Sequence, residues 1–177
     1  MIEFQINNVK PCSINKAYVR GRSVLSQEAR RYRKRLLITM TKIEGLKEQF
    51  ESFTESFDPL KDALKVSITV LVPKSVFYTK AGNVSRKSGD IGNYEKLTTD
   101  ILCSSDNIKR HFKGYSGPPT FSLNIDDQFI VHETLQKVQN ETEEWGVFIK
   151  IDKVSNSSIL NKCPDLFATF DESFYTD

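Results

Sequence analysis

Residues 64–72, LKVSITVLV, carry an apolar side chain at every second position and are followed directly by Pro73. Strict alternation over this length is typical of a strand with one buried face, and a proline seldom continues such a strand. Residues 2–6 show the same alternation. We therefore predict strands at both places, and two further strands at about 128–138 and through 145–151.

Helical spacing appears in one long segment near the N-terminus. Ser26 is a good N-cap residue, and apolar side chains then recur every three or four positions as far as Ile43. We predict a helix from there to near Gly45, followed by a connector to Pro59.

A second, shorter helix is predicted directly after Asp90. Its buried face would carry Tyr94, Leu97 and Ile101. The opposite face would carry Asn93, Lys96 and Asp100. Two helices among four strands predict a single α+β domain, with a mixed β-sheet of about four strands and helices on one face.

The composition limits the class of protein. A length of 177 residues favours one domain, and 38% hydrophobic with 27% charged residues is typical of a soluble globular protein. The chain has no apolar run near the roughly 20 residues of a membrane helix, and its first residues do not resemble a signal peptide. The spacing of Cys12, Cys103 and Cys163 fits three free thiols better than a zinc site or disulfides. We expect a cytoplasmic protein without a membrane partner.

Charge is unevenly distributed along the chain. Residues 10–35 contain nine Lys or Arg and one acid, whereas residues 164–177 contain four acids and no Lys or Arg. This asymmetry suggests a surface that faces a polyanion, although a solvated basic helix explains it nearly as well.

Three segments contain groups that could act on a phosphodiester. Metal-dependent cleavage needs carboxylates to hold Mg²⁺, a cation near the phosphoryl group, and basic residues that seat the backbone. In SGDIGNYEKLTTDIL, residues 88–102, Asp90 is either a helix cap or a metal ligand. Lys96 is either an ordinary solvated lysine or the cation.

The other two segments are NIDDQFIVHETLQKV, residues 124–138, and the basic stretch that begins SINK at residue 13. In a strand starting at Asp127, that aspartate would share a face with Glu133 and Lys137, and Asp126 would point the other way. As an isolated feature, an Asp-Asp pair before a strand is more often part of a turn than of a catalytic site. The basic stretch would place four backbone-binding side chains in a loop, namely Asn15, Lys16, Arg20 and Arg22.

In order and spacing, these segments together resemble the signature segments of the RusA-like Holliday junction resolvases. That family shows Pro-x-Ser-hydrophobic-Asn, then Asp-x-Asp-Asn-x-x-Lys at a helix start, then Asp-Asp before a strand that reaches a lysine. The corresponding positions here are Ser13, Asn15, Asp90, Gly92, Asn93, Lys96, Asp100, Asp126, Asp127 and Lys137. The resembling segments cover roughly a third of the chain.

The resemblance implies a homodimeric endonuclease that uses Mg²⁺ to cut four-way DNA junctions. It implies that Asp90 and Asp127 are metal ligands, with Asp126 as an additional candidate, and that Lys96 is the catalytic cation. DNA would be bound by Asn15, Lys16, Arg20, Arg22, Asn93 and Lys137. Residues 1–153 would form the nuclease domain, with a long inserted loop at 103–125 and an acidic, aromatic extension at 154–177.

The chain departs from the family pattern at two places. Gly92 replaces the second aspartate of Asp-x-Asp-Asn, and the loop at 103–125 is longer than the family's usual turn. Glu133 is no obvious replacement, because it would lie about 20 Å along a regular strand from Asp127.

Three hypotheses therefore stay open. The first is a junction endonuclease that acts in recombination or phage DNA processing. The second is a protein on the same fold that binds branched DNA but is weakened or inactive in catalysis because of Gly92. The third is an inhibitory factor that binds a protein partner through 103–125 or 164–177.

Overall fold

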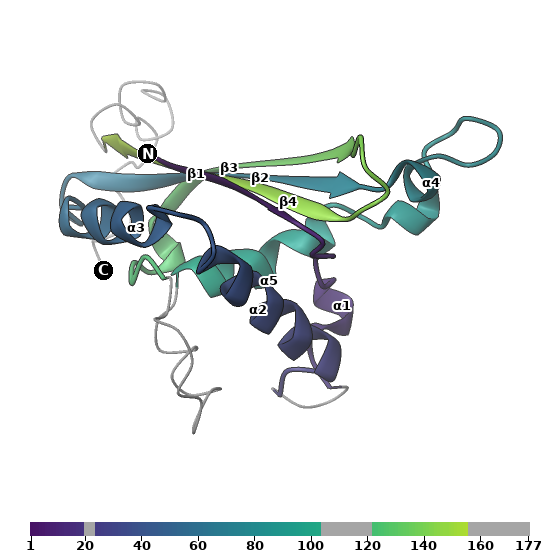
Figure 1. The fold of residues 1–177 in the computed structure, drawn as a ribbon. Coiled ribbons are helices and arrows are strands. Elements are labelled where there is room, and N and C mark those ends of the chain that lie inside the picture. The colour runs from purple at the N-terminus through teal and green to yellow at the C-terminus, as the bar shows by residue number, and fades with distance from the viewer. Residues whose placement is uncertain (20–23, 104–121, 156–177) are drawn as a thin grey trace, which may run out of the picture.

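A four-stranded mixed sheet forms one layer of the protein, in the order β1-β4-β2-β3 (Figure 1). The computed structural model describes residues 1–19, 24–103 and 122–155. The strands are β1 (Ile2–Asn7), β2 (Asp62–Val72), β3 (Ile130–Gln139) and β4 (Gly146–Ser155). β2 pairs in parallel with β3 and antiparallel with β4, and β1 pairs antiparallel with β4. The predicted α+β class and mixed four-stranded sheet are confirmed.

The helices lie along one face of this sheet (Figure 1). They are α1 (Ile14–Ala17), α2 (Gln27–Met40), α3 (Leu46–Glu55), α4 (Lys74–Phe77) and α5 (Gly92–Cys103), with 3-10 turns η1 (Arg86–Ser88) and η2 (Asp127–Phe129). α2, α3 and α5 form the second layer, and α4 lies at one end of the sheet (Figure 1). The alternating apolar residues of the strands are buried between the layers, and Ile2, Ile68 and Ile149 are each at most 2% exposed.

The long predicted helix is confirmed as α2. The Ser26 side chain accepts a hydrogen bond from the amide of Ala29 and so caps the first turn. Ala29, Tyr32 and Leu36 are buried at helical spacing, as expected. Ile43 lies beyond the helix end but still packs against the core.

The predicted connector between this helix and Pro59 is wrong, because it contains α3. Leu46, Phe50 and Phe53 are buried at intervals of three and four residues. This apolar face packs on the sheet, and its burial stabilises the helix. The other residues of α3 are mostly polar and do not by themselves predict a helix.

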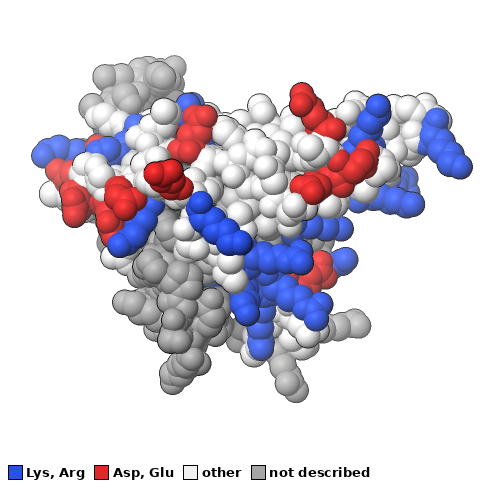
Figure 2. Space-filling model, viewed as in Figure 1, with Lys and Arg blue, Asp and Glu red and all other residues white. Residues whose placement is uncertain are grey.

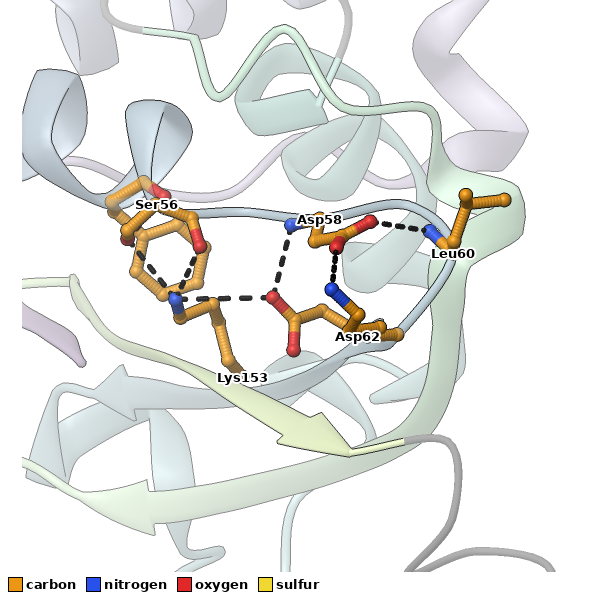
Figure 3. A network of polar contacts seen from close by, with 7 residues as sticks. Ser56, Asp58, Leu60, Asp62 and Lys153 are labelled. Atoms are coloured by element: carbon orange, nitrogen blue, oxygen red, sulfur yellow. Dashed lines mark hydrogen bonds and ion pairs between the residues drawn. The ribbon is translucent and has the colours of Figure 1, made fainter.

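A polar network fixes the turn between α3 and β2 onto β4 (Figure 3). Lys153 donates to the carbonyl of Ser56 at 2.7 Å and to its hydroxyl at 3.1 Å, and its ammonium lies 3.9 Å from Asp62. Asp62 in turn accepts from the amide of Asp58, whose own carboxylate accepts from the amide of Leu60. These contacts join the end of α3, the start of β2 and β4. They therefore fix the position of β2, the strand that pairs with β3.

Two sequence predictions fall mainly outside the described residues. Most of the 103–125 loop and nearly all of the 154–177 extension belong to the segments 104–121 and 156–177, which the structure does not describe. Cys12 and Cys103 are free thiols, as predicted, and the structure buries both, whereas Cys163 lies outside the described residues. Burial raises the pKa of the Cys12 thiol to about 11 and that of Cys103 to about 12.

Candidate active site

The start of α5 is shaped by Gly89, which has a φ of +75°. A Cβ at this position would overlap the hydroxyl of Tyr94, whose ring is buried directly above it. Asp90 follows, exposed to solvent, and its Oδ1 accepts a hydrogen bond from the amide of Gly92 at 3.2 Å. Asp90 therefore caps the helix through one carboxylate oxygen. The other oxygen makes no hydrogen bond within the described part of the chain.

Gly92 is not required by the backbone. Its φ is not positive, and the nearest atom to a Cβ built there is Asp90 Oδ1 at 3.9 Å, an ordinary van der Waals distance. The position that the resemblance assigns to an aspartate therefore has room for one.

Lys96 lies between two aspartates. Its ammonium is 2.6 Å from Asp127 Oδ2 and 3.0 Å from Asp100 Oδ1. The helix spacing explains the second contact, since residues i and i+4 share a face. The first contact joins segments 31 residues apart. The hydrogen bond to Asp127 raises the pKa of Lys96, and the same bond lowers the pKa of Asp127, so both groups stay charged near neutral pH.

Asp127 does not begin a strand, and this part of the prediction is wrong. It is the first residue of η2, where Asp126 caps the turn by accepting from the amide of Gln128 at 2.9 Å. β3 begins only at Ile130, and a register shift against β2 follows at once, which leaves Val131 unpaired. Strand alternation therefore does not separate the two carboxyl groups. The side chains of Asp126 and Asp127 interact.

Glu133 belongs to the same region, because its side chain contacts α5. Its carboxylate lies 3.5 Å from the hydroxyl of Thr99, and it also interacts with Glu95. Partial desolvation and the like charge of Glu95 raise the pKa of Glu133 to about 7, while the charge of Lys96 lowers it. The 3-10 turn and the register shift invalidate the straight-strand estimate of its distance from Asp127. Its position opposite Glu95 depends on tertiary packing and has no sequence signal.

Lys137 binds the loop that precedes α5. Its ammonium donates to the hydroxyl of Ser88 at 2.9 Å and to the carbonyl of Gly89 at 2.7 Å. Lys137 therefore holds the backbone immediately before Asp90. No pattern in the sequence indicates this contact.

A hydrogen bond between side chains links the N-terminal segment to the same helix. The side-chain amide of Asn15, in α1, donates to the side chain of Asn93 at 3.3 Å. Lys16 is exposed beside it. Arg20 and Arg22 lie outside the described residues.

The carboxylates do not form a single metal-binding cluster. Within residues 1–19, 24–103 and 122–155, no group of three or more His, Cys, Asp or Glu side chains is placed to hold a metal. Asp90 stands at the first turn of α5, whereas Asp127 contacts Lys96, at least one turn further along. Asp126 and Asp127 do interact, and Mg²⁺ in proteins is commonly held by one or two carboxylates together with water and substrate phosphates.

Comparison with models of known protein families and with curated proteins finds no match. Among the described residues, none of the helices has the length and apolar character needed to cross a membrane.

Proposed function

We propose that this protein is a Mg²⁺-dependent endonuclease that acts on four-way DNA junctions. The observation that carries the proposal is the meeting of the three segments around α5. Asn15 contacts Asn93, Lys96 contacts Asp127, and Lys137 contacts the loop before Asp90. Helix packing alone does not require polar residues from three distant segments to meet at one helix.

Lys96 has the chemistry of a transition-state cation. Its ammonium is half exposed and is held by two carboxylates, so it is positioned and yet reachable by a phosphate. A fixed cation stabilises the charge that develops on a phosphoryl oxygen as the bond to the leaving group breaks. The strong donor contact with Asp127 keeps Lys96 protonated, so its role here is electrostatic rather than that of a general base.

Asp127 and Asp126 would hold Mg²⁺, and Asp90, whose second oxygen makes no hydrogen bond within the described residues, would supply a further ligand from the helix start. When bound, the ion supplies Lewis-acid stabilisation of the phosphoryl oxygens. Side chains beside the first turn of α5 would orient the DNA strand. Its phosphates would accept hydrogen bonds from Asn15, Asn93 and Lys16. Lys137 is a positioning residue, because it acts through the backbone of Gly89.

The proposal includes a homodimer. Symmetric resolution of a four-way junction needs two cuts, in strands related by the two-fold symmetry of the junction, and a two-fold dimer supplies two sites in that relation.

The test is incubation with a labelled synthetic four-way junction and Mg²⁺. We expect paired cuts by the wild-type protein and a large loss of rate in Asp90→Asn, which retains the capping oxygen but not the charge. Undiminished cleavage by Asp90→Asn in a folded protein would remove Asp90 from the site.

A second candidate is a junction-binding protein with little or no cleavage. Two observations favour it: Gly92 lacks a carboxylate, and Asp90 and Asp127 contact different parts of α5. This candidate predicts salt-sensitive binding of the junction without product, and affinity should fall by about 0.9 decade per decade of salt for each phosphate contacted. Cleavage by the wild-type protein would exclude it.

A further inference from the structure

A groove of about 620 Å³ runs along α2. Arg31, Lys34, Arg35 and Ile38 line it at spacings of three and four residues, so they form one stripe along the helix. Tyr32 forms part of its floor, and the Tyr32 hydroxyl lies 2.7 Å from Thr98 of α5. The groove is therefore attached to the helix that carries Lys96, but on a different surface.

A fourth cation comes from another part of the chain. Lys10, which follows β1, lines the groove, and its ammonium lies 4.8 Å above the ring centroid of Trp145. The amide of Val9 donates to the carbonyl of Trp145 at 3.1 Å and fixes this segment to β4. The contact with the ring places the Lys10 charge at the groove without neutralising it.

Within the described residues, cations outnumber acids in the lining of the groove. In the part of the chain that the structure describes, none of the four basic residues lies within 4.0 Å of a carboxylate. Glu28 is the one acid in the lining. Figure 2 shows Lys and Arg side chains gathered over the region of α2. Four cations that form no ion pair with any described residue line this groove, and such a set is suited to a ligand with regularly spaced negative charges, as in a phosphate backbone.

We propose that this groove binds the phosphate backbone of a duplex DNA arm, away from the point of cleavage. The proposal rests on the proposed function, since the polyanion is taken to be the DNA that the active site cuts. Neighbouring cations on α2 are one helical turn or less apart, so their long side chains can reach successive phosphates of one strand. Apolar stems and Ile38 on the walls provide contact area without base recognition, so binding here should not depend on sequence.

The test neutralises the stripe and measures binding at several salt concentrations. The variant combines Arg31→Gln, Lys34→Gln and Arg35→Gln, and the probes are a labelled four-way junction and a linear duplex of one arm. Three lost phosphate contacts should lower the slope of log affinity against log salt by about 2.7 and weaken binding on the order of 100-fold at 0.1 M salt. Both probes should be affected, because each contains the arm. If the triple variant unfolds at a lower temperature than the wild type, the three single variants replace it. Each should change the slope by about 0.9.

The control combines Lys47→Gln, Lys61→Gln and Lys65→Gln, which removes the same charge from other elements and should leave binding close to that of the wild type. Unchanged affinity of the stripe variant, or an equal loss in the control, would overturn the groove assignment and leave the proposed nuclease intact. A loss confined to the junction would also overturn it. Loss of binding in the stripe variant together with no cleavage by the wild type would support the groove and contradict the nuclease. Absence of DNA binding by the wild type would contradict both.

Discussion

Replacing Gly92 with aspartate restores the carboxylate that the family pattern would place next to Asp90. The structure leaves room for it, because φ is not positive and the nearest atom to the new Cβ is 3.9 Å away. Gly89, three positions earlier in the chain, provides the matched control for replacing a glycine with aspartate. There the φ of +75° and the ring of Tyr94 exclude a side chain.

The expected stability changes follow from these two environments. At position 92, aspartate has a better helix propensity than glycine by about 0.3 kcal/mol. Favourable interaction with the helix N-terminus adds about 0.3–1 kcal/mol, and repulsion from Asp90 subtracts about 0.5 kcal/mol. Gly92→Asp should therefore change the free energy of unfolding by about 0 to +1 kcal/mol. Gly89→Asp should destabilise by about 2–5 kcal/mol, from the left-handed backbone and the displaced Tyr94 ring.

Urea denaturation checks the stabilities, and cleavage of a four-way junction with Mg²⁺ checks the function. We expect Gly92→Asp to cleave faster than the wild type, because an added carboxylate beside Asp90 strengthens metal binding. Gly92→Asn, of the same shape but uncharged, should not gain activity. A loss of more than 1 kcal/mol in Gly92→Asp would refute the argument that the site is open. An unchanged rate would refute the argument that the missing carboxylate limits the reaction.

Two further predictions concern charges on and beside α5. Lys96→Gln should lower cleavage by about 10²–10³-fold. Its unfolding free energy should change by less than about 1 kcal/mol, because the ion pair with Asp127 is only partly buried. Lys47→Gln, whose side chain is equally exposed at 49%, should alter neither, and a rate in Lys96→Gln equal to the wild type would dismiss the lysine as catalytic. For Glu133, whose pKa rises from 4.5 to about 7 on folding, the folded protein keeps a proton that the unfolded chain releases between these values. The stabilising contribution is therefore full below about pH 4.5 and is lost as the pH rises through 7, so Glu133→Gln should gain stability relative to the wild type over this window. Solvent screening limits the gain to about 1 kcal/mol. Urea denaturation at pH 5 and pH 8 measures it, with Glu141→Gln as the control. Equal changes in stability between the two pH values for Glu133→Gln and the wild type would contradict the prediction.

The sequence predicted those parts of the fold whose hydrophobic period is unbroken. β2, α2 and α5 were all predicted from residues that alternate or repeat every three to four positions, and each is confirmed. α3 was missed because Leu46, Phe50 and Phe53 are spread among polar residues, and only the sheet beneath them selects the helix. Local periodicity does not report a packing partner far along the chain.

The candidate site shows the same limit. Asp127 and Phe129 extend the alternation of β3 toward its N-terminus, but the cap from Asp126 to the amide of Gln128 is local and forms a 3-10 turn instead of a strand. The contact of Lys96 with Asp127 joins two segments that the sequence analysis assigned to one site. The contacts of Lys137 and Glu133 depend on how β3 lies along α5, which no pattern within either segment encodes.

Cleavage of a synthetic four-way junction by Asp127→Asn, compared with the wild type at equal binding, tests the central claim most directly. Asp127 interacts with Lys96 and with Asp126, so loss of its charge should disturb the cation and the expected metal ligands together. We predict paired cuts by the wild type and a loss of at least about 100-fold in the variant, with junction affinity retained. A folded wild-type protein that binds the junction in Mg²⁺ without cutting it, or a variant that cuts at the wild-type rate, would contradict the account.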